Sequence, residues 1–514
     1  MDVMLRLAAP LAFIVATLGI SPSQPPQPQR FDVLIRHGRV MDGSGNPWVR
    51  ADVGIAGDRI VALGSLADAT AAHVIDAHDL VVAPGFIDVH SHAGEGLGNP
   101  ALRQAQPIVA QGVTTVVINP DGGGPVNLAQ QRSTFERGGI GLNAAPLIGH
   151  GSVRAAVLGR ENRAPTADEL GRMTALVTQA MRDGAFGLSS GLFYVPGSYA
   201  KTGEVIALAR AAAPFGGVYT SHIRDEADYS VGVDAAVQEV IRIAQEAGVR
   251  GIVTHMKALG RDNWGKSAVL LKRIDDARAR GVQVFADQYP YEASSTSLRA
   301  ALAPNGVDPT EAVVADNLRR RGGADSILIA FCKRDPSLDG KRLSAIAASR
   351  GVSPVQAAIE IINAGDASIV SFNMSEADIE AIMREPYTMA SSDGGLVPVG
   401  AGHPHPRDYG AFARRLAVYV RERHIVSLEF AIRSMTSLPA LVFGIEDRGV
   451  LRPGAFADVA IFDPATIEDA ATYEQPQQLA TGVPTVLVNG VVVREDGQFT
   501  DALPGRVLRK ASRQ

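Results

Sequence analysis

FIDVHSH, residues 86–92, is a short apolar run that ends in two histidines. Seven more short apolar runs follow it, and amphipathic stretches such as 167–184 and 233–248 lie between most of them with the apolar spacing of helices. The eight runs are FIDVHSH (86–92), TTVVINPD (114–121), APLIGHGS (145–152), FGLSSGL (186–192), GVYTSHI (217–223), GIVTHMK (251–257), VQVFADQYPY (282–291) and YTMASSDG (387–394). Eight strands alternating with helices predict an α/β fold of the (β/α)8 TIM-barrel type.

The two ends of the chain have a different character, with short strands separated by Gly- and Asp-containing turns. We therefore expect one small β-sandwich domain assembled from both termini. The connection at about 292–386 is too long for a simple crossover and predicts an inserted subdomain. The predicted divisions are a signal peptide and linker at 1–29, the β domain at 30–84 and 441–514, and the barrel with its insertion at 85–440.

Composition narrows the class of protein. The chain has 514 residues, of which 46% are hydrophobic and 20% charged, as in ordinary globular proteins. A net charge of -5 gives no reason to expect nucleic acid or an anionic membrane as a partner. The single cysteine, Cys332, excludes intrachain disulfides and a thiolate-rich zinc site.

The N-terminus carries one arginine before an apolar run from Leu7 to Ile20, followed by a segment rich in Pro, Gln and Ser. The run is short for a bilayer span and is typical of a secretory signal. We therefore expect a secreted or periplasmic protein with no membrane span in its mature form.

The polar residues at the ends of the runs indicate a site. Parallel strands of a barrel bring their carboxyl ends to one face, where active sites lie. Ionisable or metal-binding side chains end six of the runs: His90 and His92, Asp121, His150, His222, His255 and Asp393. The remaining histidines lie outside strand ends, and we interpret them as surface or structural residues.

The chemistry of these residues suits a metal site. His90 and His92 are alternate residues of a strand, so both imidazoles point to the same side. With His222 and His255 they predict a zinc site that keeps one position open for water. Zinc lowers the pKa of such a water to about 7, and Asp393 is placed to act as the general acid and base. His150 lies between two glycines, and a structural role in a loop is the favoured interpretation.

Several motifs resemble the amidohydrolase superfamily, and among its members the N-acyl-D-amino-acid deacylases, or D-aminoacylases. They are APGFIDVHSH (83–92), GVYTSHIRDE (217–226), VTHMKALG (253–260), DQYPYEASST (287–296), ASSDGG (390–395), HPHPRDYG (403–410) and the closing segments GVLRPGAFADVAIFDP (449–464) and VLVNGVVV (486–493). The resemblance runs from about Phe31 to Arg509. It implies hydrolysis of a linear amide in an N-acyl-D-amino acid or a related carboxylate-bearing amide or dipeptide. D-stereochemistry rests on the resemblance alone.

The resemblance also implies roles for individual residues. His90 and His92 match a pair that binds one metal position, His222 and His255 match the pair at the tightly bound zinc, and Asp393 matches the catalytic acid and base. Arg407 matches the arginine that receives the substrate carboxylate, which suits a bidentate guanidinium. Further contacts to that carboxylate are implied for Tyr289, Ser294 and Ser295. Lys257 has two open interpretations, a contact to an acidic substrate side chain or a structural ion pair.

Asp121 departs from the family pattern, because well-known members have a cysteine ligand at the end of the second strand. A carboxylate also binds zinc and can bridge two ions through its two oxygens. We therefore expect Asp121 to be a metal ligand. Its harder oxygens predict one or two zinc ions with more tolerance of manganese or cobalt.

Two other functions are compatible with parts of the sequence. A cyclic-amide hydrolase of the hydantoinase or dihydroorotase kind uses a carboxylated lysine at the fourth strand. Between His92 and His222 the only lysine is Lys201, which follows a Pro- and Gly-containing loop. A non-catalytic metal- or ligand-binding protein is the second alternative, but such a protein is expected to have lost some ligands or the base. The sequence predicts neither the acyl group nor the oligomeric state.

Overall fold

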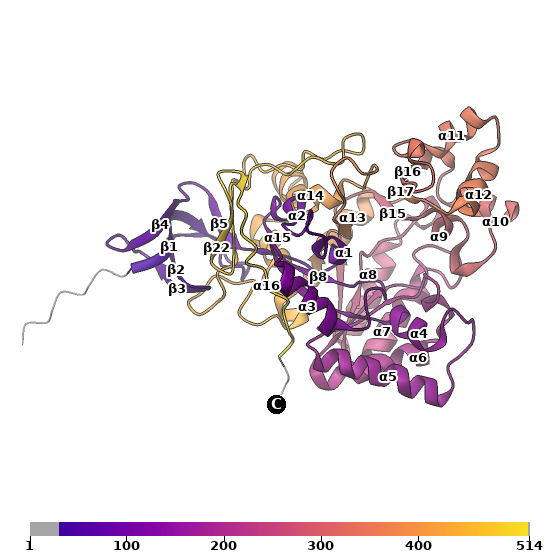
Figure 1. The fold of residues 1–514 in the computed structure, drawn as a ribbon, viewed down its shortest axis with the longest axis horizontal. Coiled ribbons are helices and arrows are strands. Elements are labelled where there is room, and N and C mark those ends of the chain that lie inside the picture. Colours follow the sequence, from indigo (N-terminus) through magenta and orange to yellow (C-terminus); the bar gives the residue numbers. More distant parts are fainter. Residues whose placement is uncertain (1–29, 512–514) are drawn as a thin grey trace, which may run out of the picture.

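The computed structural model describes residues 30–511, so the predicted signal segment at 1–29 lies outside the described residues. The strands form a nine-stranded sheet at one end of the molecule, a series of parallel strands in the middle and a small three-stranded sheet. Figure 1 shows the nine-stranded sheet at the left, helices around the middle strands, and the small sheet at the upper right. The protein has an α/β fold.

Each of the eight predicted runs contains a strand, and these strands pair in parallel in the order of the sequence. The strands are β6 (Phe86–Asp88), β8 (Val113–Ile118), β9 (Asn143–Pro146) with β10 (Ile148–Gly149), β11 (Gly187–Gly191), β12 (Val218–His222), β13 (Arg250–Val253), β14 (Val284–Gln288) and β18 (Thr388–Ala390). The eighth run returns to the first, because β19 (Gly394–Gly395) pairs in parallel with β7 (Ser91–His92). The carboxyl ends of all eight runs therefore lie on one side.

One apolar cluster contacts all eight runs. It contains a side chain from each of them: Ile87, Val117, Ala145, Phe186, Val218, Ile252, Phe285 and Met389. Leu438 and Phe443 of α16 (Ser437–Phe443) belong to the same cluster. Strands that are buried on both faces need such continuous apolar sequence, and β8 is buried at every position.

The helices cover the outside of the parallel strands. The predicted helical stretches are confirmed as α5 (Ala167–Arg182) and α7 (Val233–Ala247). A capping box between Thr166 and Glu169 starts α5, which satisfies two backbone N–H groups. The other helices of this layer are α1 (Gly94–Leu97), α2 (Gln106–Val109), α3 (Leu128–Gly138), α4 (His150–Leu158), α6 (Thr202–Ala212), α8 (Ser267–Ala279), α13 (Glu376–Met383), α14 (Arg407–Arg414) with a π-helix at Arg415–Glu422, and α15 (Leu428–Met435).

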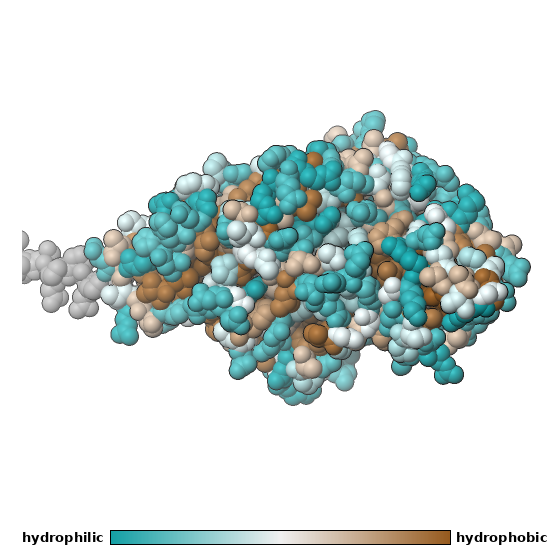
Figure 2. Space-filling model, turned by 90° about the horizontal axis from the view of Figure 1, so that it is seen from above, coloured by the Kyte–Doolittle hydropathy of each residue, from teal (hydrophilic) through white to brown (hydrophobic). Residues whose placement is uncertain are grey.

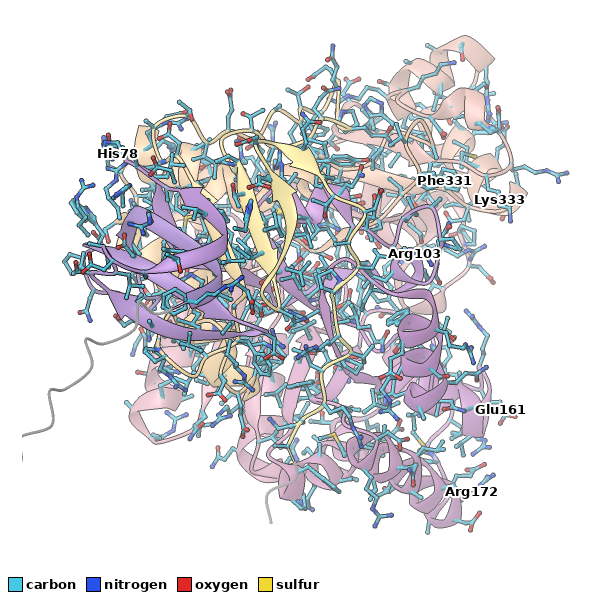
Figure 3. The ribbon with its side chains drawn as sticks, turned by 60° about the vertical axis from the view of Figure 1, so that its left-hand side comes forward. His78, Arg103, Glu161, Arg172, Phe331 and Lys333 are labelled. Carbon is cyan, nitrogen blue, oxygen red and sulfur yellow. The ribbon has the colours of Figure 1, made fainter. Side chains whose placement is uncertain are left out.

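The long connection after the seventh strand forms a small unit with its own core. Its antiparallel sheet has the order β15 (Ala293–Ser297), β17 (Ser368–Phe372), β16 (Ile327–Phe331). Its helices are α9 (Leu298–Leu302), α10 (Glu311–Arg320), α11 (Leu343–Arg350) and α12 (Pro354–Ala364). Figure 3 labels exposed Phe331 and Lys333 beside this sheet. The next helix, α13, instead contacts α8 and β14 of the parallel series.

The nine-stranded sheet draws on both ends of the chain. The strands are β1 (Arg30–Val40), β2 (Val49–Ala56), β3 (Arg59–Gly64), β4 (Thr70–Asp76) and β5 (Val81–Pro84) from the first end, and β20 (Val459–Phe462), β21 (Thr485–Val488), β22 (Val491–Glu495) and β23 (Gln498–Phe499) from the second. The antiparallel pair of β5 with β20 joins the two groups. His78 lies exposed at its edge (Figure 3).

Two further features concern the surface and the C-terminal segment. Figure 2 shows apolar surface at the end of the molecule formed by the nine-stranded sheet, where Val49, Val61 and Val74 are exposed. Beyond β23 the chain returns to the parallel strands, since Val507 forms a parallel bridge with Ala144. Within residues 30–511 no helix is both long and apolar enough to cross a membrane.

Candidate metal centre

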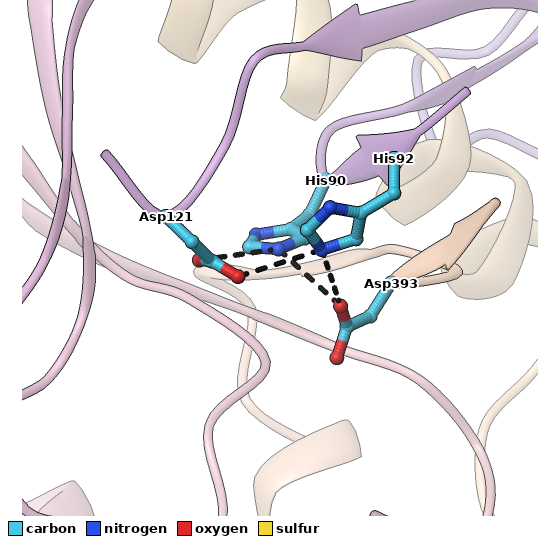
Figure 4. A group of neighbouring side chains, drawn as sticks. All are labelled: His90, His92, Asp121 and Asp393. Carbon is cyan, nitrogen blue, oxygen red and sulfur yellow. Dashed lines mark hydrogen bonds and ion pairs between the residues drawn. The ribbon is translucent and has the colours of Figure 1, made fainter. Parts of the chain in front are cut away.

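Asp121 lies at the centre of the four predicted histidines. Its Oδ1 is 3.4 Å from His90 Nε2 and 3.6 Å from His255 Nε2. Its Oδ2 is 3.4 Å from His92 Nε2 and 3.9 Å from His222 Nδ1. Figure 4 shows Asp121 facing the two histidines of the first run, with Asp393 on their other side. The structure therefore brings together five side chains from four strand ends.

Two groups of possible ligands share Asp121. The first group is His90, His92, Asp121 and Asp393, and the second is Asp121, His222 and His255. In the first group, His92 Nε2 lies 3.1 Å from Asp393 Oδ1. The arrangement is that of a two-position metal site with one shared carboxylate.

The backbone at three of these positions adopts an unusual conformation. Asp121, His255 and Asp393 have φ angles of 55°, 36° and 50°, in a region that L-residues rarely adopt. Such conformations persist where the surrounding structure enforces them, and they gather at functional sites. Here the turn directly after each strand directs the side chain toward the shared site.

Two buried aspartates hold the backbone of the ligand segments. Asp88 accepts hydrogen bonds from the N–H groups of His90 (3.2 Å) and Ser392 (3.0 Å), so it joins the first run to the eighth. Burial raises the pKa of Asp88 to about 6. Asp287, at the end of the seventh strand, accepts from the N–H of His255 at 2.9 Å. Neither aspartate was recognised from the sequence.

The glycines that follow Asp121 allow its turn to pack against neighbouring strand ends. Gly122 has a φ of 74°, and a Cβ added to it would lie 2.9 Å from the backbone nitrogen of Gly191 and 3.0 Å from that of Gly151. A Cβ on Gly191 would lie 2.3 Å from the backbone oxygen of Asp121. These contacts place the end of the second strand against the third and fourth runs.

The donor atoms fit a divalent metal ion. Both ring nitrogens of His90, both of His222, and Asp121 Oδ1 are buried and have no hydrogen-bond partner among the described residues. Buried polar groups are nearly always satisfied, so this concentration of unpaired nitrogen and oxygen atoms indicates a bound cation. Imidazole and carboxylate are the donors that zinc accepts. The donor set therefore fits zinc without a thiolate.

The protonation of the candidate ligands differs from one side chain to the next. Burial disfavours the charged form of Asp121, but the surrounding His90, His255 and His92 hold its pKa well below its usual value. Burial lowers the pKa of His222 to about 4, so this imidazole is neutral. Two histidines behave in the opposite way. Burial opposes their charge, but nearby carboxylates raise the pKa of His92 to about 10 and that of His255 to about 9.

Asp393 lies between the histidines and Arg407. Its Oδ2 is 2.7 Å from Arg407 Nη1. Burial opposes ionisation, yet Arg407 and His255 keep the pKa of Asp393 well below its usual value. The carboxylate is therefore ionised at neutral pH and able to accept a proton. Arg407 is buried, and its Nε has no hydrogen-bond partner among the described residues.

The cluster opens into one large cavity of about 1360 Å³. Among the predicted site residues, its lining includes His92, Asp121, His222, His255, Lys257, Ser294, Ser295, Asp393 and Arg407. Tyr289 does not line it, since this side chain is buried behind the guanidinium of Arg407, 4.8 Å from its ring centre. The Tyr289 hydroxyl lies 3.4 Å from Met374 Sδ.

Glu226 is a site residue that the sequence analysis missed. Its Oε1 lies 2.6 Å from Lys257 Nζ and 3.1 Å from His255 Nδ1, and its Oε2 lies 3.7 Å from His222 Nε2. Burial disfavours its charge, but Lys257 and the two histidines hold its pKa well below the usual value. Lys257 is thus in an ion pair, one of its two predicted environments. The signal was present in GVYTSHIRDE, where Glu226 follows His222 by four residues.

Two other residues considered from the sequence lie outside the cluster. His150 begins α4 instead of lying in a loop, and its Nε2 lies 2.9 Å from Glu204 Oε1. Lys201 is exposed immediately before α6, and the fourth strand ends in Gly191. A carboxylated lysine at the fourth strand, as in the cyclic-amide hydrolases, is therefore not available.

Parallel strands that deliver histidines and aspartates to one cavity define a metal-dependent hydrolase site. Residues 73–494 match the model of the amidohydrolase family, and the chain belongs to this family. It is 38% identical over 509 residues to a D-aminoacylase of Alcaligenes xylosoxydans xylosoxydans, covering 94% of this chain and 99% of the relative. It is also 38% identical to an N-acyl-D-glutamate deacylase of the same organism, covering 94% and 97%.

Solved structures agree with this assignment. N-acyl-D-glutamate deacylase from Bordetella bronchiseptica, solved with zinc and a phosphonate inhibitor that mimics the tetrahedral intermediate, has a TM-score of 0.82 and 37% identity. That comparison covers 94% of this chain and all of the other.

Proposed function

We propose that this protein is a metal-dependent deacylase that hydrolyses the amide bond of N-acyl-D-amino acids. The observation that carries the proposal is the placement of Asp121 within 3.9 Å of all four histidines, with Asp393 and Arg407 beside them. The D-aminoacylase and N-acyl-D-glutamate deacylase relatives support the substrate class. A dipeptide or another amide with a carboxylate is the nearest alternative substrate.

We propose that His90, His92, Asp121, His222 and His255 hold the metal, as one ion or two that share Asp121. Zinc bound there would supply a Lewis acid and lower the pKa of a water molecule to about 7. The zinc complex of the Bordetella relative supports zinc, and the carboxylate of Asp121 favours tolerance of manganese or cobalt.

The protein side chains then account for the proton transfers. Asp393, ionised and on the cavity wall, accepts the proton of the attacking water and returns it to the leaving amine. Arg407, which lines the cavity, orients the substrate by binding its α-carboxylate. Ser294 and Ser295 line the same cavity and supply hydroxyl donors. Tyr289 supports the guanidinium of Arg407 from behind.

Glu226 acts as a positioning residue for the metal ligands in this proposal. A histidine that binds metal through Nε2 must carry its proton on Nδ1, and a carboxylate that accepts from Nδ1 fixes this tautomer. Glu226 Oε1 lies 3.1 Å and Lys257 Nζ 2.7 Å from His255 Nδ1, whereas His255 Nε2 lies 3.6 Å from Asp121. With the proton on Nδ1, Glu226 accepts from it and Lys257 donates to the carbonyl oxygen of His255. Lys257 offsets the charge of Glu226.

We further propose that the eight parallel strands close into a (β/α)8 barrel at 85–440 with the insertion at about 292–386, and that 30–84 and 441–514 form a β-sandwich domain. The β7–β19 pair and the shared apolar cluster support closure. Secretion or a periplasmic location, with removal of the 1–29 segment, remains part of this proposal and rests on the sequence of that segment.

Assays on protein depleted of metal by a chelator and then reconstituted with zinc test the function. We expect release of acetate from N-acetyl-D-amino acids, slower reaction with the L-enantiomers, and loss of activity on depletion. Dihydroorotate and hydantoins are the matched cyclic amides. Turnover of the cyclic amides alone, or no hydrolysis of any amide by zinc-loaded protein, would contradict the proposal.

The role of Asp393 has a separate test. Asp393→Asn keeps the size of the side chain but removes the base, so we expect kcat to fall by roughly 10²–10⁴-fold. Bound zinc, measured by mass spectrometry, should stay close to wild type. Residual turnover above a tenth of wild type would exclude Asp393 as the base.

A further inference from the structure

Three cationic side chains line the cavity: Lys257, Arg321 and Arg407. Two of them are neutralised by carboxylates of the same cavity, since Lys257 pairs with Glu226 and Arg407 pairs with Asp393. Arg321 has no ion pair with any carboxylate among residues 30–511, although it is only 2% exposed. A buried charge is costly unless it is paired, so Arg321 requires an explanation.

The neutral groups around Arg321 fix its position. Its Nε donates to the carbonyl oxygen of Ala301 at 3.1 Å, and its Nη1 lies 3.4 Å from Ser371 Oγ. With its amide oxygen turned toward Arg321, Asn373 accepts from Nη1 at 3.0 Å, and its amide nitrogen then donates to Ser294 Oγ at 3.0 Å. The guanidinium is therefore connected through Asn373 to Ser294, which lines the cavity. Its Nη2 has no hydrogen-bond partner among the described residues.

The carboxylates that act on Tyr229, the ring beside Arg321, have partners elsewhere. Asp225 accepts hydrogen bonds from the backbone N–H groups of Ala227, Ser230 and Gly232. Asp228 pairs with the neighbouring Arg320, and Glu226 pairs with Lys257. The charge of Arg321 is thus left for a group that enters the cavity.

The cavity wall around Arg321 is suited to an anion. Ser294, Ser295, Thr296, Ser297 and Ser368, which line this part of the cavity together with Arg321, supply hydroxyl groups. A row of rings connects the metal centre to Arg321. The Phe193 ring lies 5.5 Å from the His222 ring and 5.9 Å from the Tyr229 ring, and the Arg321 guanidinium lies 5.6 Å from the Tyr229 ring. The hydroxyl-lined wall around Arg321 belongs to the inserted unit, whereas Arg407 begins α14.

We propose that Arg321 binds a second carboxylate of the substrate, so that the preferred substrates are N-acyl-D-amino acids with an acidic side chain. This inference rests on the proposed function and deepens it. Arg407 receives the α-carboxylate beside Asp393, and Arg321 receives the side-chain carboxylate from the wall formed by the inserted unit. Arg321 is a specificity-determining residue that takes no part in the proton transfers.

A comparison of isosteric substrates tests the proposal on the zinc-loaded, full-length enzyme. N-acetyl-D-glutamate and N-acetyl-D-glutamine differ only in the charge of the side chain, and N-acetyl-D-methionine serves as an apolar reference. We expect wild type to prefer the glutamate substrate by roughly 10–100-fold in kcat/KM, the range for a charge-assisted hydrogen bond. Arg321→Met should abolish this preference and leave kcat/KM for the glutamine substrate within about threefold. Arg321→Lys should keep part of the preference.

Arg320→Met is the matched control, because Arg320 is the adjacent arginine and pairs with Asp228 and Asp316 outside the cavity. It should leave the preference unchanged. Equal losses for the charged and neutral substrates in folded Arg321→Met, judged by its thermal melt, would assign Arg321 a structural role and overturn the inference. If Arg321→Met does not fold, the wild-type enzyme and Arg321→Lys decide the inference. A wild-type preference for the glutamate substrate that is reduced but not lost in Arg321→Lys supports it. A wild-type preference for the neutral substrates, or a preference that is unchanged in Arg321→Lys, overturns it. If neutral N-acyl-D-amino acids are the best substrates, the inference about Arg321 is wrong but the deacylase function stands. If no N-acyl amino acid is hydrolysed, the deacylase function itself is wrong.

Discussion

The two halves of the metal centre share Asp121 but differ in their surroundings. His222 and His255 have side chains that are 7% and 1% exposed, and Glu226 lies behind them. On the other side His92 is 43% exposed and faces Asp393. The first half has a supporting carboxylate behind its two histidines, whereas the second half is exposed to the cavity through His92 and adjoins the proposed base. We infer that the buried half holds the metal tightly and the open half serves the reaction.

Loss of Asp121 should affect both halves and gives the largest expected effect. Asp121→Ala removes the one ligand that the halves share, so we expect metal content below 0.1 ion per chain and activity reduced by roughly a thousandfold or more. The metal content of each variant is measured by elemental analysis after dialysis. Asp121→Cys is the control, because well-known relatives have cysteine at this position, and it should retain metal. Full metal and activity in Asp121→Ala would reduce Asp121 to a turn residue.

Substitution of one histidine in each half should separate their roles. His222→Ala should remove the tightly bound ion, because the buried half supplies only three ligands. His92→Ala should leave that ion in place and weaken only the second position. Competition with a chromogenic chelator gives both affinities. Equal weakening by the two variants would show that the halves do not differ in the way their burial indicates.

Removal of the charge of Glu226 should have a smaller effect. Glu226→Gln keeps the size of the side chain but leaves Lys257 unpaired and the His255 tautomer less well fixed. Partners of this kind contribute roughly 10–100-fold in metal affinity. The double variant Glu226→Gln with Lys257→Met is the matched control for the unpaired charge. An affinity at the wild-type level in both variants would contradict the positioning role.

Metal affinity should also depend on pH, with a change of roughly tenfold for a step of one pH unit, the smallest of the four effects. In the metal-free protein the pKa of His222 is about 4 and that of His255 is about 9. At neutral pH only His255 of the buried half must release a proton before it binds metal. Affinity should therefore rise roughly tenfold per pH unit from pH 6 to 8 and level off above about 9. Calorimetry in buffers of different ionisation enthalpy counts the released protons, and a count of zero would contradict the assignment.

The position of the site was predictable from the sequence because it follows from strand direction. The carboxyl ends of parallel strands lie on one side, so residues at the ends of the runs lie close together. His222 and Asp121 could therefore be placed in one site without knowledge of side-chain contacts. Asp287 lies at the end of the seventh run, so the same rule places it near the site. Asp88 lies two residues before His90 on the same strand, so its side chain points to the same side as that of His90. Both were overlooked, although the signal was present.

Other contacts depend on loops and insertions, for which periodicity gives no direction. Glu226 returns to the cluster from the segment after β12, and Arg321 comes from the end of α10 in the inserted unit. Tyr289 follows a strand end as predicted, yet it packs behind Arg407 instead of lining the cavity. These positions are determined by tertiary packing, which the local sequence pattern does not contain.

The central claim is that one carboxylate, Asp121, joins two metal positions. The most direct measurement is a crystal structure of the zinc-loaded protein with anomalous diffraction at the zinc edge. The account predicts a zinc ion about 2.0–2.2 Å from an oxygen of Asp121 and about 2.0–2.1 Å from nitrogens of His222 and His255. Any second ion should lie on the His90 and His92 side of the same carboxylate. Zinc bound by the histidines with Asp121 turned away would contradict the account.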